Sequence, residues 1–232
     1  MTPLEKKLRA QLTALRDITL AINAAGTLDQ ILAHITRRTA RVMDVDSCSI
    51  YLRDDGGEFL VLKATTGLAA DAVGKARLKW GEGLTGVAAK SNKPVAASHA
   101  ARDPRFKYLP ETKESMFQSL LAVPLVSRTK VIGALNVQTK EGREYADDEI
   151  ELLSIIADVA AGELEKAVLY EEIGGLKEAL ETRKLVERAK GILMARHGIT
   201  EEAAFTRIQH QARASRKAMR EIAEAIIVAE QV

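Results

Sequence analysis

The spacing of the apolar residues changes twice along this 232-residue chain, and these changes restrict the folds that it can adopt. From Leu4 to Ile22, apolar residues recur every three or four positions, which predicts one apolar stripe along a helix. Between Ser47 and Gln138 the pattern is that of short strands separated by turns, and from Asp147 the helical spacing returns. This order predicts an α+β fold, with helices gathered on one face of an antiparallel sheet.

The predicted sheet follows a helix that begins near Thr27. Thr27 and Gln30 have the spacing of a capping box, in which the two side chains satisfy free backbone amides of the first turn. Residues 54–57, Asp-Asp-Gly-Gly, supply a turn that makes a hairpin of the first two strands. Short connections favour antiparallel neighbours. Strands are predicted at residues 47–52, 59–62, 78–80, 94–97, 120–126 and 131–138.

The helical spacing after Asp147 extends beyond what one small domain needs. A first seam consists of Ile150, Leu153, Ala157, Ala160, Leu164 and Ala167, and after a shift of phase it resumes at Leu169, Ile173, Leu176 and Leu180. A helix of about 30 residues or more that projects from a domain usually has a partner, so the seam predicts a helical stalk and a homodimer. Gly174 and Gly175 each cost about 1 kcal/mol in a helix interior, which favours a bend or hinge there.

The last 50 residues predict a bundle of three helices and carry a net positive charge, whereas the rest of the chain is slightly negative. Residues 183–232 hold ten Lys or Arg against six Asp or Glu, whereas the first 182 residues hold 24 against 26. A nucleic-acid partner requires such a local excess of positive charge, although the same excess is also found on surfaces that only contact solvent. The expected caps are Gly198 for the end of the first helix, Thr200 for the start of the second and Ser215 for the start of the third. We expect Phe205, Ile208 and Ala212 to face inward.

Catalytic and metal-binding motifs are missing from the sequence. It contains no G-x-x-x-x-G-K-[ST], H-E-x-x-H or G-x-S-x-G segment, and its single cysteine, Cys48, can form neither an internal disulfide nor a cysteine-based zinc site. The run Gly81–Gly86 favours a strand-to-helix turn over a phosphate loop. The longest apolar run, Leu120–Val126, has seven residues, far below the roughly 20 that cross a bilayer. The N-terminal segment lacks the order of a secretion signal. We therefore expect a cytoplasmic protein that is not an enzyme and that needs no metal, cofactor or membrane.

Four segments in the middle of the chain carry a family resemblance. They are Gly81–Gly86 (GEGLTG), Asp103–Phe106 (DPRF), Ser119–Leu125 (SLLAVPL) and Val131–Leu135 (VIGAL). Through them, residues 26 to 168 resemble the GAF domain, a small-molecule sensing module related to the PAS fold. The resemblance implies a twisted antiparallel sheet with a pocket on one face, covered here by residues 98–117.

That cover carries three aromatic residues, Phe106, Tyr108 and Phe117, which are the candidate residues of an effector pocket. A packed loop without a ligand explains them nearly as well. The N-K-x-F-D-E signature of cyclic-nucleotide GAF domains is missing, and no cysteine lies where a bilin would attach. The effector is therefore expected to be an unidentified small molecule, and no cofactor is expected.

Three segments near the end of the chain carry a second resemblance. They are Val186–Met194 (VERAKGILM), Thr200–Phe205 (TEEAAF) and Ala212–Ser215. The apolar pairs within residues 222–227 follow them at the spacing that the family shows. Residues 177 to 232 thereby resemble the ANTAR domain, an RNA-binding module of bacterial transcription antiterminators. The resemblance implies a three-helix bundle that binds paired RNA hairpins in nascent transcripts as a dimer.

The basic residues of the bundle suit an RNA partner. Lys190 and Gly191 fall within the family motif, where the lysine can meet a phosphate or a base edge and the glycine lets another backbone approach; simple helix packing explains Gly191 equally well. Because Phe205 is expected in the core, arginine planes or histidines would stack on loop bases, or phosphate contacts would dominate. The predicted RNA-binding residues are Lys184 and Arg188, one turn apart, Arg216 and Arg220, a second such pair, and Lys190, Gly191, Arg213 and Lys217.

The sequence therefore predicts a ligand- or signal-responsive antitermination regulator. The alternative is a GAF-containing regulator that binds DNA, with a helix of the bundle in the major groove. The N-terminal helix either packs on its own domain or pairs with a partner helix. The predicted parts are an amphipathic helix at 1–25, a GAF-like sensor at 26–168, a helical linker at 169–176 and an ANTAR-like RNA-binding domain at 177–232.

Overall fold

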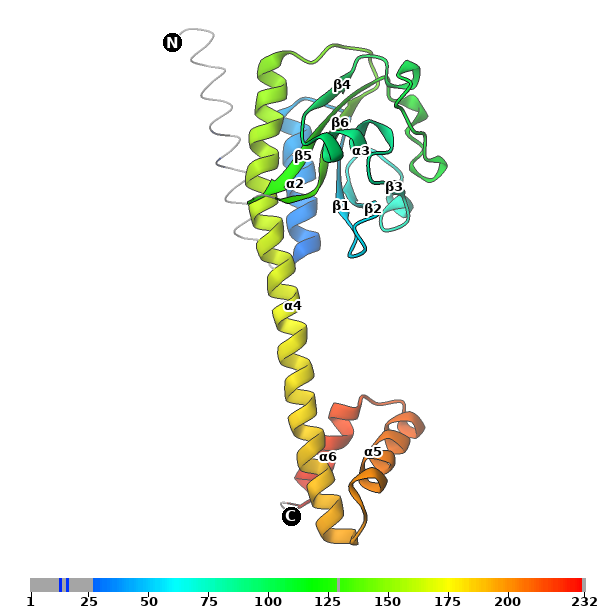
Figure 1. Cartoon of the computed structure of the whole chain (residues 1–232), viewed down its shortest axis with the longest axis vertical. Helices are drawn as coiled ribbons and strands as arrows, with labels where there is room; N and C mark the ends of the chain where they lie inside the picture. The colour runs from blue at the N-terminus through cyan, green and yellow to red at the C-terminus, as the bar shows by residue number, and fades with distance from the viewer. Residues whose placement is uncertain (1–12, 14–15, 17–26, 129, 231–232) are drawn as a thin grey trace. The chain divides into compact units, whose positions relative to one another are not determined.

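The structure is a computed structural model that describes residues 13, 16, 27–128 and 130–230. The predicted N-terminal helix at 1–25 therefore lies almost wholly outside the described residues. The chain divides into two compact units, Met1–Val168 and Leu169–Val232, and Figure 1 shows the elements of each. None of the described helices has both the length and the apolar composition that a bilayer span requires.

Unit 1 is built on a six-stranded antiparallel sheet in the order β3-β2-β1-β6-β5-β4. The predicted hairpin is confirmed as β1 paired with β2, and β5 pairs with β6 through the short turn that follows Ser127. The α+β fold is therefore confirmed. The strands are β1 (Ser47–Arg53), β2 (Phe59–Thr65), β3 (Arg77–Lys79), β4 (Val95–Ala97), β5 (Ser119–Ser127) and β6 (Lys130–Thr139).

One face of this sheet is covered by α2 (Leu28–Val42) and by the first part of α4 (Asp147–His197). The predicted capping box begins α2: the Gln30 amide donates to Thr27 Oγ1 at 3.3 Å, and the Thr27 amide donates to Gln30 Oε1 at 3.2 Å. Ile35 of α2 and Leu153 of α4 are completely buried in the core that results. Unit 1 therefore has a continuous apolar layer on this side of the sheet.

The opposite face of the sheet packs against α3 (Gly83–Ser91) and a run of short 3₁₀ turns. The predicted strand-to-helix turn is confirmed, because α3 begins directly after β3. Gly81 at φ +89° and Gly83 at φ +69° both adopt the left-handed conformation that favours glycine. The 3₁₀ turns η2 (Ala100–Arg102), η3 (Pro110–Thr112) and η4 (Glu114–Met116) lie within residues 98–117, the predicted cover.

The long helix α4 passes through Gly174 and Gly175 without ending. The first helix of the predicted three-helix bundle is therefore the last part of α4 and not a separate helix, since two glycines cost too little to end a helix of 51 residues. The predicted seam also divides. In its first part Leu153 and Leu164 are completely buried in the core of unit 1, whereas Leu176 in its second part is 71% exposed.

Unit 2 is a bundle formed by the last turns of α4 with α5 (Glu201–Ser215) and α6 (Met219–Glu230). As predicted, α4 ends at His197, and the Gly198 amide donates to the Met194 carbonyl at 2.9 Å. The small core comprises Val186, Ala189 and Leu193 from α4, Ala204, Ile208 and Ala212 from α5, and Ile222, Ala223 and Ile227 from α6.

The predicted start of α6 at Ser215 is wrong. Ser215 is the last residue of α5, and its hydroxyl donates to the Gln211 carbonyl at 2.6 Å. Arg216 then adopts a left-handed conformation, φ 54°, and its amide donates back into α5. The next helix begins only at Met219, where Glu221 accepts from the Ala218 amide at 3.1 Å.

Candidate nucleic-acid interface

The orientation of α5 determines which side chains of the bundle face outward. Thr200 caps this helix as predicted, since its hydroxyl accepts from the Ala203 amide at 3.3 Å. Ala204, Ile208 and Ala212 are buried in the bundle core. Because a helix turns by about 100° per residue, the remaining faces of α5 lead away from that core.

Lys190 does not face outward, contrary to the prediction. It is only 7% exposed, and its ammonium donates to Glu201 at 2.6 Å and to Glu187 at 2.9 Å. The hydrogen bond to Glu201 contributes most to raising the pKa of Lys190, followed by the hydrogen bond to Glu187, and both favour the charged ammonium. Lys190 therefore joins α4 to the first turn of α5, and an incoming phosphate would have to compete with two carboxylates.

Two further predicted cations are also paired within the bundle. Lys184 contacts Glu181 at 2.8 Å, one turn earlier in α4, and Arg220 contacts Glu224 at 2.9 Å in α6. The contact with Glu224 raises the pKa of Arg220. The predicted one-turn pair of Arg216 and Arg220 is wrong, since Arg216 lies at the end of α5 and Arg220 in α6.

The other four predicted cations are exposed: Arg188, Arg213, Arg216 and Lys217. None of them forms an ion pair with another residue in the part of the chain that the structure describes. Arg213, Arg216 and Lys217 lie within five residues of one another at the end of α5 and in the turn that follows. This end of α5 therefore carries a local positive charge that no carboxylate of residues 27–128 or 130–230 neutralises through an ion pair.

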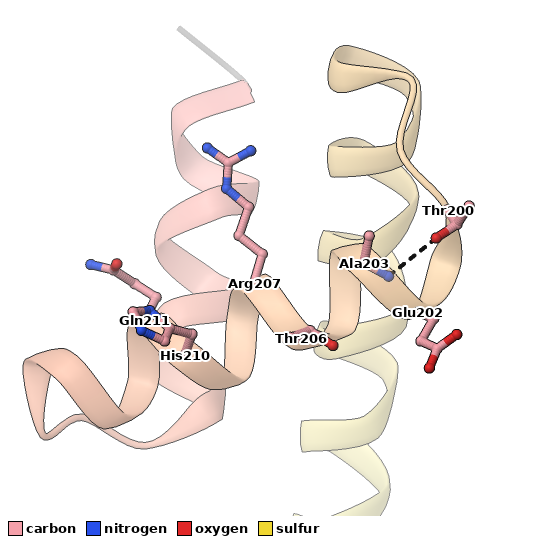
Figure 2. Close-up of a pocket in the computed structure, with 7 residues that line it drawn as sticks. All are labelled: Thr200, Glu202, Ala203, Thr206, Arg207, His210 and Gln211. Carbon is pink, nitrogen blue, oxygen red and sulfur yellow. Dashed lines mark hydrogen bonds between the residues drawn. The ribbon is translucent and has the colours of Figure 1, made fainter.

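A wide, open hollow of about 660 Å³ lies along the outer face of α5, and Figure 2 shows the side chains around it. Arg207, His210 and Gln211 project there, and all three can donate hydrogen bonds. Arg207 was missed in the sequence analysis. Its position one residue before the buried Ile208 does not mark it as functional, but a helical wheel of α5 places it away from the apolar stripe. The hollow is lined by Thr200, Glu202, Ala203, Thr206, Arg207, His210 and Gln211.

Two other residues of the bundle have surroundings that sequence reasoning did not settle. The expectation that Phe205 is buried is wrong: the ring is 40% exposed, because Ala204 and Ile208 occupy the core-facing positions of α5. Gly191 is also exposed, and a Cβ atom at this position would meet no atom within 4 Å. Packing within the described chain therefore does not explain the glycine.

The aromatic residues predicted for an effector pocket do not form one group in unit 1. Phe117 is buried with Tyr51 and Leu109 in one apolar cluster. Phe106 packs against a different cluster, and Tyr108 is 42% exposed. Phe117 therefore anchors the end of residues 98–117 in the apolar core on this face of the sheet.

Comparison with known proteins defines the class to which this structure belongs. The family model of the GAF domain matches residues 27–164, more than half of the chain, so the chain belongs to the GAF domain family. The model of the ANTAR domain matches residues 175–227. The protein therefore consists of a GAF domain followed by an ANTAR domain, as the sequence motifs predicted.

The curated relatives match the two parts separately. The phosphoenolpyruvate-dependent phosphotransferase system of Escherichia coli (strain K12) is 31% identical over 167 residues, which cover 72% of this chain. Transcriptional regulatory protein PdtaR of Mycobacterium tuberculosis (strain ATCC 25618 / H37Rv) is 49% identical over 63 residues, 27% of this chain. The matched regions span only 22% and 31% of these two relatives.

Solved structures agree with the GAF assignment. The GAF domain of a phosphoenolpyruvate-protein phosphotransferase (ptsP) from Coxiella burnetii has a TM-score of 0.66 and 32% identity, covering 71% of this chain and 98% of that domain. The corresponding domain from Acinetobacter has a TM-score of 0.63, also at 32% identity, and covers 73% and 97%.

Proposed function

We propose that this protein is a signal-responsive transcription antitermination regulator whose ANTAR domain binds paired hairpins in nascent RNA. The ANTAR match and the regulatory relative PdtaR support this function. The observation that carries the proposal is the set of exposed cations at the end of α5, Arg213, Arg216 and Lys217, which lack internal ion pairs within the described residues. Such a regulator works in the cytoplasm and performs no catalysis.

The predicted RNA-binding set divides into two roles under this proposal. Arg188, Arg213, Arg216 and Lys217 contact phosphates or loop bases directly, because their charges are free for an external partner. Arg207 and His210 extend this surface along α5. Lys184, Lys190 and Arg220 mainly hold the bundle in shape, while the open surface at Gly191 allows close approach of another backbone.

The test is a binding titration at several salt concentrations with an RNA of two hairpins. Replacing Arg213, Arg216 or Lys217 by Ala should each weaken binding and lower the slope of log K against log salt by about 0.7 to 0.9 for every phosphate that the variant no longer neutralises. Lys184→Ala is the matched control, because Glu181 already pairs with this ammonium. Unchanged affinity in all three variants would contradict the assigned surface. Tighter binding to duplex DNA than to the RNA would favour the alternative regulator that binds DNA.

We further propose that the protein is a homodimer joined along α4. Leu169, Ile173, Leu176 and Leu180 repeat with steps of four, three and four residues, and each is at least 45% exposed. That spacing is the seam of a two-stranded coiled coil. A second copy of the same helix would bury these side chains and bring together the two bundles that two hairpins need.

The GAF domain would supply the signal to this dimer. An effector held beneath the cover, residues 98–117, would shift the register of the paired α4 helices or bend them at Gly174 and Gly175. Either change would alter the distance between the two RNA-binding surfaces. A signal that leaves the affinity for the two-hairpin RNA unchanged would contradict this coupling.

A further inference from the structure

The two faces of the sheet in unit 1 differ in their buried side chains. Because successive strand residues point to opposite faces, Leu135 and Val137 of β6 enter the continuous apolar core beneath α2 and α4. Asn136 and Gln138 point to the other face, which they share with Ala134. On that face the apolar side chains form two separate clusters. Asn136 and Gln138 are therefore buried on the face of the sheet whose apolar core consists of two separate clusters.

These polar side chains are held in place by two different elements. Asn136 donates its amide hydrogen to Thr85 Oγ1 of α3 at 2.8 Å, and Gln138 donates to Glu114 Oε2 of η4 at 3.0 Å. Ser47 of β1 lies directly opposite Gln138 in the ladder. Because the amide nitrogen of Gln138 donates to the Glu114 carboxylate, the amide oxygen of Gln138 points away from that carboxylate.

Three atoms of this cluster have no hydrogen-bond partner among the described residues: Asn136 Oδ1, Gln138 Oε1 and Ser47 Oγ. The three residues are 3%, 1% and 0% exposed, so bulk water does not satisfy them. Buried polar atoms in folded proteins almost always have a partner. The Ser47 hydroxyl can donate or accept, whereas the two amide oxygens can only accept, so these two acceptors on the same face of one strand point to an external donor.

Glu114 adds an ionisable carboxyl group to the same cluster. This side chain is 7% exposed, and burial raises the pKa of its carboxyl group. Gln138 and the backbone of Leu109 donate to it, but no Lys, Arg or His among the described residues forms an ion pair with it. A buried carboxylate without a cation is costly, so a positive charge placed beside it would be strongly favoured.

We propose that this cluster binds a small molecule with a positively charged nitrogen group that carries at least two N–H donors. Its hydrogens would donate to Asn136 Oδ1 and Gln138 Oε1, and its charge would pair with Glu114. The inference rests on the proposed function, because it identifies the class of effector that the GAF domain senses. Since the unpaired atoms are closed off from solvent, the molecule enters as the cover that carries Glu114 moves aside.

A matched pair of probes tests the required charge. Acetamidinium and acetamide have the same size and shape, but only acetamidinium is charged and has four N–H hydrogens. We expect acetamidinium to shift the side-chain amide NMR signals of Asn136 and Gln138 in the full chain, in a saturable manner. Acetamide should bind at least about tenfold more weakly, the loss of one charge-assisted hydrogen bond. Equal shifts with both probes, or none with either, would overturn the proposal.

Variants assign the effect to the cluster. Glu114→Gln keeps the size of the side chain but removes its charge, and it should abolish the preference for acetamidinium. Glu111→Gln is the control, because Glu111 lies exposed on the same cover. If the acetamidinium shift survives unchanged in Glu114→Gln, the assignment is wrong. The wild-type comparison needs no variant and holds even if Glu114→Gln fails to fold.

RNA titrations on the same samples separate this inference from the proposed function. If the two-hairpin RNA binds but acetamidinium does not, the inference fails and the RNA-binding function stands. If acetamidinium binds and the RNA does not, the ligand class stands and the RNA-binding function fails. An experimental structure with ordered waters donating to both amide oxygens would also overturn the inference.

Discussion

The two halves of the apolar seam along α4, residues 150–167 and 169–180, have similar spacing but opposite surroundings. In the first half, Leu153, Ile156 and Leu164 are completely buried against the sheet of unit 1. In the second half, Leu169 and Leu176 are 45% and 71% exposed. A helical seam therefore predicts a helix with a buried face, but it does not predict which surface buries that face. The spacing of the seam breaks between Ala167 and Leu169, and its side chains change from buried to exposed at the same place.

The largest expected effect tests the buried half. Ile156→Ala should lower the free energy of unfolding of unit 1 by about 2–5 kcal/mol, because it leaves a cavity in the core. Trp80, the single tryptophan of the chain, lies in unit 1 and reports its urea unfolding by fluorescence. The neighbouring Ile155 is 40% exposed, so Ile155→Ala should change the same quantity by only about 0.5 kcal/mol. Equal losses in the two variants would show that the helix is rotated from the position described.

The second effect tests whether a second copy covers the exposed half. Leu176→Asp places a charge in the proposed seam and should raise the dimer dissociation constant at least about tenfold, or about 1.4 kcal/mol. Sedimentation equilibrium measures this constant. Gly175→Asp is the matched control, since a side chain at Gly175 meets no atom within 4 Å and lies on another face of the helix. A wild-type protein that remains monomeric would contradict the dimer.

A third and smaller effect tests the glycine pair that lies within the exposed half. A Cβ atom at Gly174 would meet no other atom within 4 Å, so Gly174→Ala should stabilise the helix by about 1 kcal/mol. Far-UV circular dichroism should record a higher unfolding temperature for unit 2, while the Trp80 transition of unit 1 stays unchanged. If the variant instead lowers that temperature, the glycine is needed for a bend that alanine resists.

The smallest effect concerns the last turns of α4, where an ion pair adds to a small core. The hydrogen bond from Lys190 lowers the pKa of Glu201 below its usual 4.5. A carboxyl group with a lowered pKa in the folded state stabilises it above the unfolded pKa, and this contribution is lost as the pH falls through the folded pKa. Glu201→Gln should therefore destabilise unit 2 slightly at neutral pH and make no difference in acid.

Urea unfolding of unit 2 at neutral pH and at about pH 3 measures this dependence. Glu202→Gln is the control, because Glu202 is exposed and forms no ion pair within the described residues. A difference between the Glu201→Gln variant and the wild-type protein that persists in acid would show that the contact is not an ion pair. Because both carboxylates that Lys190 contacts are largely exposed, the effect should stay small.

Much of unit 1 could be predicted because its signals are local. The capping box of Thr27 and Gln30 and the turn before α3 involve residues within a few positions of each other. Alternation of polar and apolar residues indicated the strands close to their observed bounds. The buried pairs of Asn136 with Thr85 and of Gln138 with Glu114 were not predicted, because each joins residues more than twenty positions apart.

The RNA-binding surface was predicted only in part, for a related reason. Lys190, Arg188 and Arg213 look alike in the sequence, and the motif drew attention to Lys190. Its second carboxylate partner, Glu201, lies eleven residues away, beyond the end of α4. The start of α6 was misplaced because Arg216 takes a left-handed conformation that is uncommon outside glycine.

By itself, the sequence determined the order of helices and strands, the caps at Thr27 and Thr200 and the two domain families. These depend on spacing and on contacts that a residue makes with its near neighbours in the chain. Only the tertiary structure decided which cations remain free, which half of the α4 seam lacks cover and which buried oxygens lack a donor. Those properties depend on side chains that approach one another only after the chain has folded.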